Sequence, residues 1–386
     1  MKDPILQNQA LGQHMLYFDQ PRVKSLFETT PDGKRRRIGY ADEREGVELL
    51  DFGRARFHFY APDAESVRMH GWGGSMPGDF DFRRDTDGYW TLELDNVQPG
   101  FHYCHFYVNG VKTLNQLMPF GYGGFTVCNF FEMPDRDADF FLLQDVPHGD
   151  VRMELYQSPV NGRTKAAWIY CPPGYDANPD RRYPVLYIQH GVGENETGWI
   201  WQGKLNYICD NLIAEGKMEP MLVVMNSGYA FVDGEINMFM PGDFERELCE
   251  ACIPAIDAKY RTLSDRESRA IAGLSLGSAQ AFSIGITHME DLFSAIGVFS
   301  GGIAPKSMFG AYDLSAYFED AERFRKLIRV LFVSGGESEG MIAPNQKVLD
   351  ELAERGIQGV HYTHPGYHEW DVWRYSLREF LQLLFR

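Results

Sequence analysis

One serine in this 386-residue chain stands in a pattern that could make it a nucleophile. Ser275 is the centre of Gly273-Leu274-Ser275-Leu276-Gly277, a Gly-x-Ser-x-Gly motif. Residues 267–273 predict a buried strand, and residues 276–288 are small and apolar enough to predict a packed helix. The two glycines keep side chains out of the tight turn between them. The hydroxyl would then project from the end of the strand and could attack a substrate; in the alternative reading the serine only caps the helix.

A serine hydroxyl needs a general base within hydrogen-bond reach to act at neutral pH. Of the eleven histidines, three follow the later predicted strands. His361 alternates within the last strand and His364 ends it, whereas His368 lies in a loop just before the closing helix. A loop histidine can reach back to the serine. We therefore predict His368 as the base, with His364 as the alternative.

The base needs a carboxylate that orients the imidazole and stabilises its cation. The order serine, acid, histidine along the chain places this acid after the predicted strand 330–334. The loop Gly335-Gly336-Glu337-Ser338-Glu339-Gly340 offers two glutamates and no aspartate. Glu339 is the predicted acid and Glu337 is the alternative.

Acyl transfer from an ester or amide also needs N–H groups that bind the oxyanion of the tetrahedral intermediate. One donor is the amide of Leu276, the residue after the serine. The other should come from the glycine-containing loop 189–199, in which Val192 is the preferred donor.

Other residues of the same loop are assigned supporting roles. His190 is expected to anchor the loop rather than to react. Trp199 and Trp201 could form the wall of a site for an aromatic acyl group or could pack internally. Trp199 and Glu194 are the predicted substrate-binding residues.

From Val151 onward, predicted strands and helices alternate in a way that would position these residues. Several strands are continuous apolar runs, typical of parallel strands buried on both faces. The expected strands cover 151–157, 166–171, 184–189, 221–226, 295–299, 329–334 and 359–363. The expected helices cover 204–215, 243–259 with a kink near Pro254, 344–354 and 370–384. This succession predicts an α/β-hydrolase domain with a doubly wound sheet over 145–386.

Residues 46–140 follow a different pattern, in which apolar and polar residues alternate with period two. Short strands are expected at 56–60, 66–70, 89–94 and 101–108, and Asn109-Gly110 predicts a type I′ hairpin turn. This pattern predicts an all-β sandwich. Residues 115–150 would contain its last strand and a linker. Residues 1–45 are a polar lead, in which the basic run 34–37 is expected to be a solvated loop.

The composition excludes several classes of protein. The 44% hydrophobic and 24% charged content is that of a globular protein long enough for two domains. A net charge of −17 argues against a nucleic-acid partner or an anionic membrane surface. No stretch has the length of a membrane span, and no secretory signal is visible, so we expect a cytoplasmic protein.

Neither a metal nor a cofactor is expected. Six cysteines in so long a chain do not indicate a disulfide framework. Cys249 and Cys252 form a C-x-x-C pair without a second pair, and we interpret them as two helical thiols. The oligomeric state stays open, and a homo-oligomer is compatible with the sequence.

Four motifs, HGVGENETGW, AGLSLGS, GGESEG and GYHEWDVW, resemble those of the esterase D superfamily. The most similar group is the family 1 carbohydrate esterases, which include feruloyl esterases and acetyl xylan esterases. The resemblance covers about 145–386 and implies a serine esterase that releases ferulate or related acyl groups from plant-wall sugars. It carries over Ser275 as nucleophile and His368 as base. Glu339 takes the acid position, where the family commonly has aspartate, and Ser278 stands where the family commonly has glycine.

The earlier segments FHFYAPDAESVRMHG, DGYWTLEL and PGFHYCHFYVNG resemble the early-set, immunoglobulin-like modules classed with family 48 carbohydrate-binding modules, which implies an immunoglobulin-like β-sandwich. This resemblance implies sugar binding by residues 46–140. Trp72, in Gly71-Trp72-Gly73-Gly74, is the candidate for an exposed ring, whereas Trp90 lies on an alternating strand and is expected in the core.

Two alternatives to a feruloyl esterase stay open. One is an esterase for acetylated sugars or siderophore esters, which would use the same chemistry. The other is a non-catalytic carbohydrate-binding protein built on a hydrolase scaffold. The lack of a visible secretion signal favours imported feruloylated oligosaccharides as the substrate over intact polymer.

Overall fold

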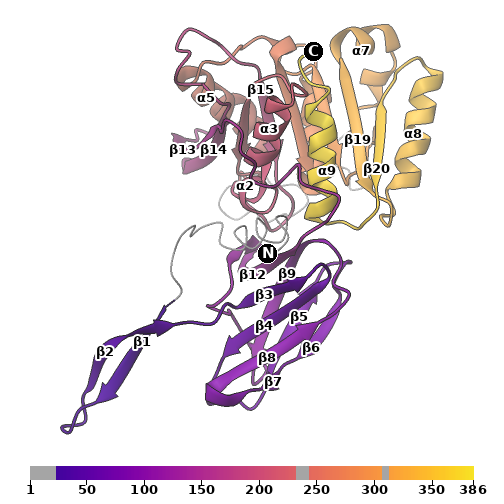
Figure 1. Cartoon of the computed structure of the whole chain (residues 1–386). Helices are drawn as coiled ribbons and strands as arrows, with labels where there is room; N and C mark the ends of the chain where they lie inside the picture. The colour runs from indigo at the N-terminus through magenta and orange to yellow at the C-terminus, as the bar shows by residue number, and fades with distance from the viewer. Residues whose placement is uncertain (1–22, 232–242, 307–312) are drawn as a thin grey trace. The chain divides into compact units, whose positions relative to one another are not determined.

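The computed structural model of the chain describes residues 23–231, 243–306 and 313–386 (Figure 1). These residues form two compact units. The first contains the described residues up to Gly121 together with Val127–Asp139, and the second contains Tyr122–Thr126 and Phe140–Arg386. The sequence placed the end of the sandwich at 140 and the start of the next domain at 145, but it gave no sign that Tyr122–Thr126 groups with the second unit.

The first unit is built from two antiparallel sheets. One has the strand order β3-β4-β8-β7, and the other has the order β11-β12-β9-β5-β6, with β10 paired to β9. The strands are β3 (Val47–Asp51), β4 (Arg54–Tyr60), β5 (Val67–Trp72), β6 (Gly78–Asp81), β7 (Arg83–Arg84), β8 (Tyr89–Leu94), β9 (Gly100–Val108), β10 (Val111–Thr113), β11 (Phe120–Gly123) and β12 (Thr126–Met133). Alternate residues of both sheets meet in one core, as the period-two pattern predicts.

This core contains Phe57, Met69 and Phe106, which are fully buried. Trp90 is 5% exposed and its indole N–H donates to the Ala61 carbonyl, so the expectation that it packs in the core is correct. Trp72 is 42% exposed. Alternate residues of a strand point to opposite faces, so Trp72 lies on the outer face of β5, whereas Met69 points into the core.

A separate two-stranded hairpin precedes the sandwich, formed by β1 (Val23–Thr29) and β2 (Arg35–Asp42). The prediction that the basic run 34–37 is a loop is therefore wrong for its last three residues, which begin β2. The strand tolerates them because cross-strand partners neutralise or cover the cations. Arg36 pairs with Glu28, and the Arg35 guanidinium lies 3.7 Å from the centre of the Phe27 ring.

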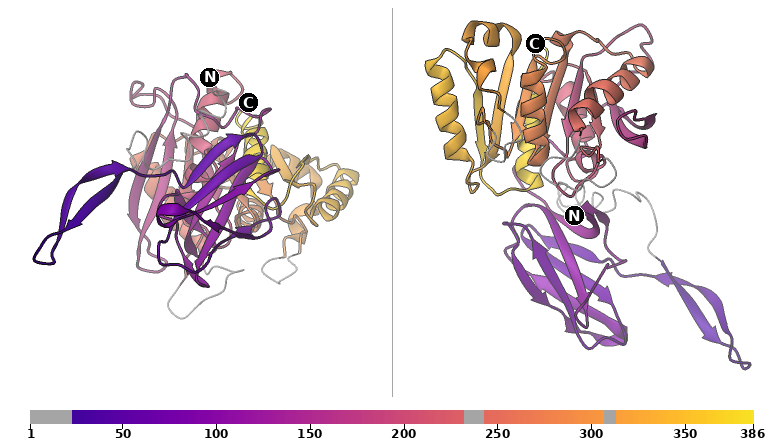
Figure 2. Two further views of the ribbon diagram at one scale, coloured as in Figure 1. Left: turned by 60° about the horizontal axis from the view of Figure 1, so that its bottom comes forward. Right: turned by 180° about the vertical axis from the view of Figure 1, so that it is seen from behind.

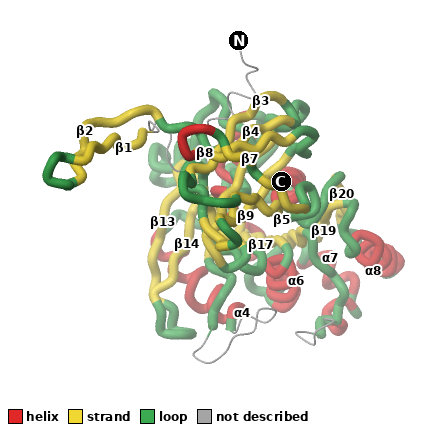
Figure 3. The backbone as a smooth tube through the Cα atoms, turned by 90° about the horizontal axis from the view of Figure 1, so that it is seen from below, coloured by secondary structure: helices red, strands yellow, loops and turns green. Residues whose placement is uncertain are grey.

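The second unit is organised around an eight-stranded sheet with the order β13-β14-β16-β15-β17-β18-β19-β20. Its strands are β13 (Asp150–Gln157), β14 (Thr164–Cys171), β15 (Val185–Gln189), β16 (Leu222–Asn226), β17 (Arg269–Leu274), β18 (Ala295–Phe299), β19 (Val330–Gly336) and β20 (Val360–His364). The first two strands are antiparallel, and from β16 to β20 every pair is parallel. In Figure 3, β13 and β14 lie at one side of this sheet and β19 and β20 at the other.

Helices cover both faces of this sheet (Figures 1 and 2). They are α2 (Gly198–Trp201), α3 (Leu205–Ala214), α4 (Phe244–Arg246), α5 (Ile253–Lys259), α6 (Leu276–Thr287), α7 (Ala321–Leu327), α8 (Ile342–Glu354) and α9 (Trp370–Leu381). Two successive residues of β18 show the two layers. Ile296 packs against Gly285 of α6, whereas the space over Gly297 is filled by Phe380 of α9. The doubly wound fold predicted for 145–386 is thus present.

The helix predicted over 243–259 is broken into pieces. Between α4 and α5 the chain forms a π-helical turn, Glu247–Cys252, which ends two residues before Pro254. Proline cannot donate the backbone hydrogen bond of a regular helix, so the irregularity falls where the kink was expected. Cys249 and Cys252 lie in this turn as free thiols. No helix in the described ranges combines the length and apolarity needed to cross a bilayer.

Candidate active site

The turn between β17 and α6 holds Ser275 in a strained backbone conformation. Its φ is 52° and its ψ is −116°, values that a residue with a side chain rarely adopts. A Cβ on Gly273 would lie 2.2 Å from the Gly277 carbonyl oxygen, and one on Gly277 would lie 2.5 Å from the His190 carbonyl oxygen. Both glycines are therefore required by close backbone approach. The Ser275 side chain makes no capping hydrogen bond to α6, which argues against the reading of a simple helix cap.

Ser278, one of the two departures from the family pattern, is accommodated by this turn. Its hydroxyl donates to the Ser275 carbonyl at 2.5 Å. The hydroxyl has room because the residue beside it is Gly301. Any residue with a Cβ at that position would place it 1.7 Å from the Ser278 oxygen.

Glu339 is the carboxylate that contacts His368. Its Oε2 lies 2.7 Å from His368 Nδ1, while its Oε1 accepts hydrogen bonds from the Ser300 hydroxyl at 2.6 Å and the Gly336 amide at 2.7 Å. Glu337 is exposed, and its amide donates to the His364 carbonyl. The His364 ring stacks on Tyr375 with the ring centres 3.7 Å apart, and its Nδ1 lies 2.7 Å from the Pro365 carbonyl oxygen. The geometry thus favours the preferred residues, Glu339 and His368, over both alternatives.

Electrostatics keep Glu339 ionised. Burial by itself would raise the pKa of this carboxyl group, but hydrogen bonds from His368, Ser300 and the Gly336 amide lower it overall. Because Nδ1 of His368 faces a carboxylate, we assign its proton to that nitrogen, which leaves Nε2 able to accept a proton.

Ser300 connects this pair to the serine turn. The Ser275 amide donates to the carbonyl of Phe299, the residue just before Ser300. The Ser300 hydroxyl accepts from the indole N–H of Trp373, whose ring lies edge-on to the His368 imidazole at 5.1 Å. Ser275, Glu339 and His368 therefore lie at the same edge of the sheet, although within the described residues no hydrogen bond joins the Ser275 hydroxyl to the imidazole.

The loop after β15 is anchored by His190, as expected from the sequence. His190 is 1% exposed, its Nδ1 donates to the Gly191 carbonyl, and its Nε2 accepts from the Gly228 amide. Burial lowers the pKa of this histidine to about 4, so the ring is neutral and serves as a structural link.

The two predicted substrate-binding residues lie inside the protein instead of lining the site. Trp199 is 1% exposed, and its indole N–H donates to the Gln189 carbonyl. Glu194 is 6% exposed, and its carboxylate accepts from the Gly191 amide at 3.1 Å and from the Trp370 indole at 2.9 Å. Both assignments are corrected: Trp199 fills the core because an indole of this size buries a large apolar area, and Glu194 ties the loop to α9.

The loop after β15 touches the serine turn at Gly191, the residue before Val192. A Cβ on Gly191 would lie 3.4 Å from the Ser275 Cβ, so the two segments are in contact. The Tyr229 hydroxyl accepts from the Gly193 amide at 2.8 Å and donates to the Gly191 carbonyl at 3.4 Å, which holds the backbone on both sides of Val192. Within the described chain, the amides of Val192 and Leu276 donate to no protein acceptor. Both are therefore available for an oxyanion.

Sequence reasoning missed Ser300 and Tyr229. Ser300 directly follows β18, at the carboxyl edge of a strand that lies between β17 and β19. Since ligands of parallel α/β sheets bind at this edge, its position was the available signal. Nothing in the local sequence around Tyr229 indicates that its hydroxyl supports a loop 36 residues earlier.

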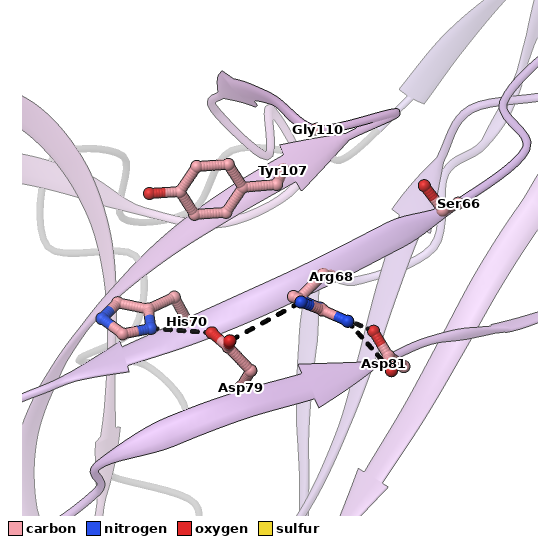
Figure 4. Close-up of a pocket in the computed structure, with 7 residues that line it drawn as sticks. All are labelled: Ser66, Arg68, His70, Asp79, Asp81, Tyr107 and Gly110. Atoms are coloured by element: carbon pink, nitrogen blue, oxygen red, sulfur yellow. Dashed lines mark hydrogen bonds and ion pairs between the residues drawn. The ribbon is translucent and has the colours of Figure 1, made fainter.

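The first unit carries a separate polar pocket on the outer face of β5, β6 and β9 (Figure 4). Its volume is about 500 Å³. Arg68 pairs with Asp81 at 2.7 Å and with Asp79 at 3.6 Å, and Asp79 also contacts His70 at 2.8 Å. Tyr107 stands opposite Arg68 in the register of the strands.

Aromatic rings continue this face along the strands. Trp72 lies 5.2 Å from Tyr103 and 5.5 Å from His105, measured between ring centres. This outer face of the sandwich therefore combines flat rings with charged hydrogen-bonding groups.

Comparison with known proteins places the second unit in a family. Residues 158–384 match the family model described as a putative esterase. An endo-1,4-β-xylanase/feruloyl esterase of Xylanibacter ruminicola is 35% identical over 349 residues, which cover 86% of this chain and 45% of the relative. The chain thus spans less than half the length of that protein. Endo-1,4-β-xylanase Y of Acetivibrio thermocellus is 30% identical over 170 residues, 40% of this chain and 15% of its own.

Solved structures show the same fold. A ferulic acid esterase matches with a TM-score of 0.54 and 26% identity, covering 61% of this chain and 97% of its own. The enterobactin esterase of Shigella flexneri matches with a TM-score of 0.62 over 87% of this chain and 94% of its own; at 15% identity this likeness shows the fold alone. The predicted α/β-hydrolase fold is confirmed, and the chain belongs to this esterase family.

Proposed function

We propose that this chain is a serine carboxylic-ester hydrolase that works through an acyl-enzyme. His368 Nε2 takes the proton of the Ser275 hydroxyl while the serine oxygen attacks the ester carbonyl carbon. Glu339 stabilises the imidazolium that forms. The amides of Val192 and Leu276 donate to the oxyanion of the tetrahedral intermediate.

The same groups complete the reaction in reverse roles. When the intermediate collapses, His368 gives its proton to the leaving alcohol and the acyl group stays on Ser275. A water molecule then enters, His368 accepts its proton, and the hydroxide attacks the acyl carbonyl. The bond to the Ser275 oxygen breaks, His368 returns the proton to that oxygen, and the acid leaves. The observation that carries this proposal is the contact between Glu339 and His368 at the sheet edge where Ser275 occupies its strained turn.

Replacing the nucleophile tests the assignment. Ser275→Ala removes the attacking oxygen and should abolish most of the ester hydrolysis. The small rate that remains would come from the oxyanion donors and from substrate binding alone. Circular dichroism should show an intact fold, because alanine leaves the packing of this turn in place. Turnover close to that of the wild type would mean that another residue is the nucleophile.

For the acyl group we propose ferulate or a related hydroxycinnamate, carried on a plant-wall oligosaccharide. Support for the acyl group comes from the relative of Xylanibacter ruminicola, which is named an endo-1,4-β-xylanase/feruloyl esterase, and from the solved structure named a ferulic acid esterase. Acetyl-sugar and siderophore esters are the alternatives within the same chemistry. Comparing kcat/KM for methyl ferulate, p-nitrophenyl acetate and a catecholate siderophore ester distinguishes the three.

A second function, carbohydrate binding by the sandwich, is favoured by one surface feature. The exposed Trp72 ring, with Tyr103 and His105 beside it, offers flat apolar faces next to the pocket of charged groups in Figure 4. Flat rings can cover the apolar faces of sugar rings while Arg68 and Asp79 exchange hydrogen bonds with hydroxyl groups. Affinity electrophoresis in gels that contain different polysaccharides tests this function separately from hydrolysis.

A further inference from the structure

An aromatic residue occupies a turn position that normally requires glycine or asparagine. Gly124 and Phe125 connect β11 to β12, and their φ values are 58° and 62°. Two successive positive φ values are typical of a type I′ turn, for which Asn-Gly is the preferred sequence. The hairpin between β9 and β10 uses that sequence, Asn109-Gly110, at φ values of 49° and 78°. Phenylalanine at positive φ is a genuine outlier that costs conformational energy.

Packing does not explain this residue. The Phe125 side chain is 47% exposed, so its ring contributes little to a core. The strained backbone costs conformational energy, and the exposed ring contributes little burial to offset that cost. Natural chains keep such features mainly where they serve a function.

The turn lies directly on the loop that presents Val192. Tyr122–Thr126 belongs to the same compact unit as this loop. The Phe125 amide donates to the Gly193 carbonyl at 2.9 Å, and a Cβ on Gly193 would lie 2.9 Å from the Gly124 Cα. The Tyr122 carbonyl accepts from the Gln202 side chain at 3.0 Å. These contacts fix the turn against the backbone next to the predicted oxyanion donor.

Three aromatic rings form a row from this point. The centre of the Phe125 ring lies 6.3 Å from that of Tyr229, and Tyr229 lies 5.3 Å from Phe231 with the ring planes 19° apart. Tyr229 also holds Gly193 through its hydroxyl. We call Phe125, Tyr229 and Phe231 the aromatic row. Its first member, Phe125, is hydrogen-bonded to Gly193, which lies two residues after Gly191, where the loop touches Ser275.

We propose that the aromatic row binds the aromatic ring of the ester substrate and that Phe125 is a specificity-determining residue. This inference rests on the function proposed above. An exposed ring in such a row offers its face to a planar group, and stacked or tilted aromatic pairs are more favourable than burial of area alone. The energy that the strained turn costs would be recovered only when an aromatic substrate is bound.

Replacing the ring without disturbing the turn tests the proposal. Phe125→Asn and Phe125→Gly both suit a positive φ and keep the amide that donates to Gly193. Three esters are compared: methyl ferulate with an aromatic acid, phenyl butyrate with an aromatic alcohol, and methyl butyrate with neither. We expect the ratio of kcat/KM for an aromatic ester to that for methyl butyrate to fall about tenfold, as the loss of one aromatic contact predicts.

The thermal midpoint supplies a second readout. Because both substitutions relieve strain, the midpoint should stay equal or rise while the selectivity falls, a combination that a purely structural role would not produce. Phe27→Asn, which removes a ring of similar exposure (43%) in β1, is the control and should leave the ratio unchanged.

The three esters identify which ring is bound. A fall for methyl ferulate alone assigns the aromatic row to the acid, and a fall for phenyl butyrate alone assigns it to the alcohol. Equal losses on all three esters, or no change in either ratio, would overturn the proposal. Failure of the proposed function itself would show differently, as ester hydrolysis that survives Ser275→Ala.

Discussion

At the scale of single residues, the choice between two glutamates two positions apart decides the chemistry. The side chain of Glu339 is 8% exposed and bound on both oxygens, whereas Glu337 is exposed to solvent. Glu339→Gln keeps the shape of the side chain but removes the charge that stabilises the imidazolium and selects its tautomer. We expect kcat to fall by about 10³ to 10⁴, as loss of the orienting acid does in serine hydrolases.

Glu337→Gln is the matched control for this prediction. It changes the same group on the same loop, and kcat should stay within about twofold of the wild type, as expected for a surface substitution. Steady-state hydrolysis of methyl ferulate measures both variants. Equal losses in the two variants would show that Glu339 has no special relation to His368.

Which residues could be predicted depended on whether a motif marked them. Ser275 and Glu339 stand in glycine-rich loops after predicted strands, and His368 stands in a loop before a predicted helix. Trp199 was placed wrongly because a loop sequence does not reveal whether an indole points inward. Phe125 was missed, since its importance lies in its φ value, which the residue type does not suggest.

At the scale of elements, His190 links two loops and makes their attachment sensitive to pH. Its folded-state pKa of about 4 lies below the value of about 6.5 for an unfolded chain. Between these values the unfolded chain binds a proton that the folded ring excludes. This contribution to stability is therefore complete above pH 6.5 and is lost as the pH falls toward 4.

The resulting prediction concerns the slope of stability with pH. Between pH 7 and pH 5, His190 should lower the free energy of unfolding by about 2 kcal/mol. Urea titrations at the two pH values measure the change in the wild type and in His190→Gln, whose side chain does not titrate. The variant should lose less stability than the wild type over this interval; an identical loss would rule out His190 as the source.

The regular elements were predictable because their periodicity is strong. The strand 295–299 was placed with its observed bounds, since continuous apolar runs in a doubly wound sheet have few other interpretations. The helix predicted over 243–259 was broken by a π-helical turn that periodicity does not distinguish from regular helix. The run Arg35–Arg37 was assigned to a loop because three successive cations are unusual in a strand. The residues of β1 that pair with these arginines cannot be recognised until the pairing of β1 with β2 is known.

At the scale of the whole molecule, two functions are proposed for two units, and they can be separated by one substitution. Trp72 is the exposed ring of the sandwich face, in a unit that does not contain Ser275. Trp72→Ala should abolish retardation by the polysaccharide that retards the wild type, because it removes the largest flat apolar surface of the face. Hydrolysis of methyl ferulate should be unchanged.

Trp90 offers the contrast for that experiment. It lies in the core, so Trp90→Ala should destabilise the sandwich by about 3–5 kcal/mol instead of acting on sugar binding alone. If the wild-type protein migrates unretarded in every polysaccharide gel, the carbohydrate-binding proposal fails and the pocket in Figure 4 needs another explanation.

The division into units was predictable only in part. The change from period-two patterning to alternating strands and helices marks the transition near 140. The grouping of Tyr122–Thr126 with the second unit could not be predicted, because it depends on contacts with residues about 70 positions later, such as that of Phe125 with Gly193.

Covalent labelling is the sharpest test of whether Ser275 is a nucleophile that His368 activates. An activated serine attacks the phosphorus of a fluorophosphonate probe, as it would attack an ester carbonyl carbon, and displaces fluoride to leave a stable covalent label. Mass spectrometry of the digested protein should find one label per chain, on the peptide that contains Ser275, and no label in His368→Ala. A label on a different residue, or none on the folded wild-type protein, would mean that Ser275 is not the activated nucleophile.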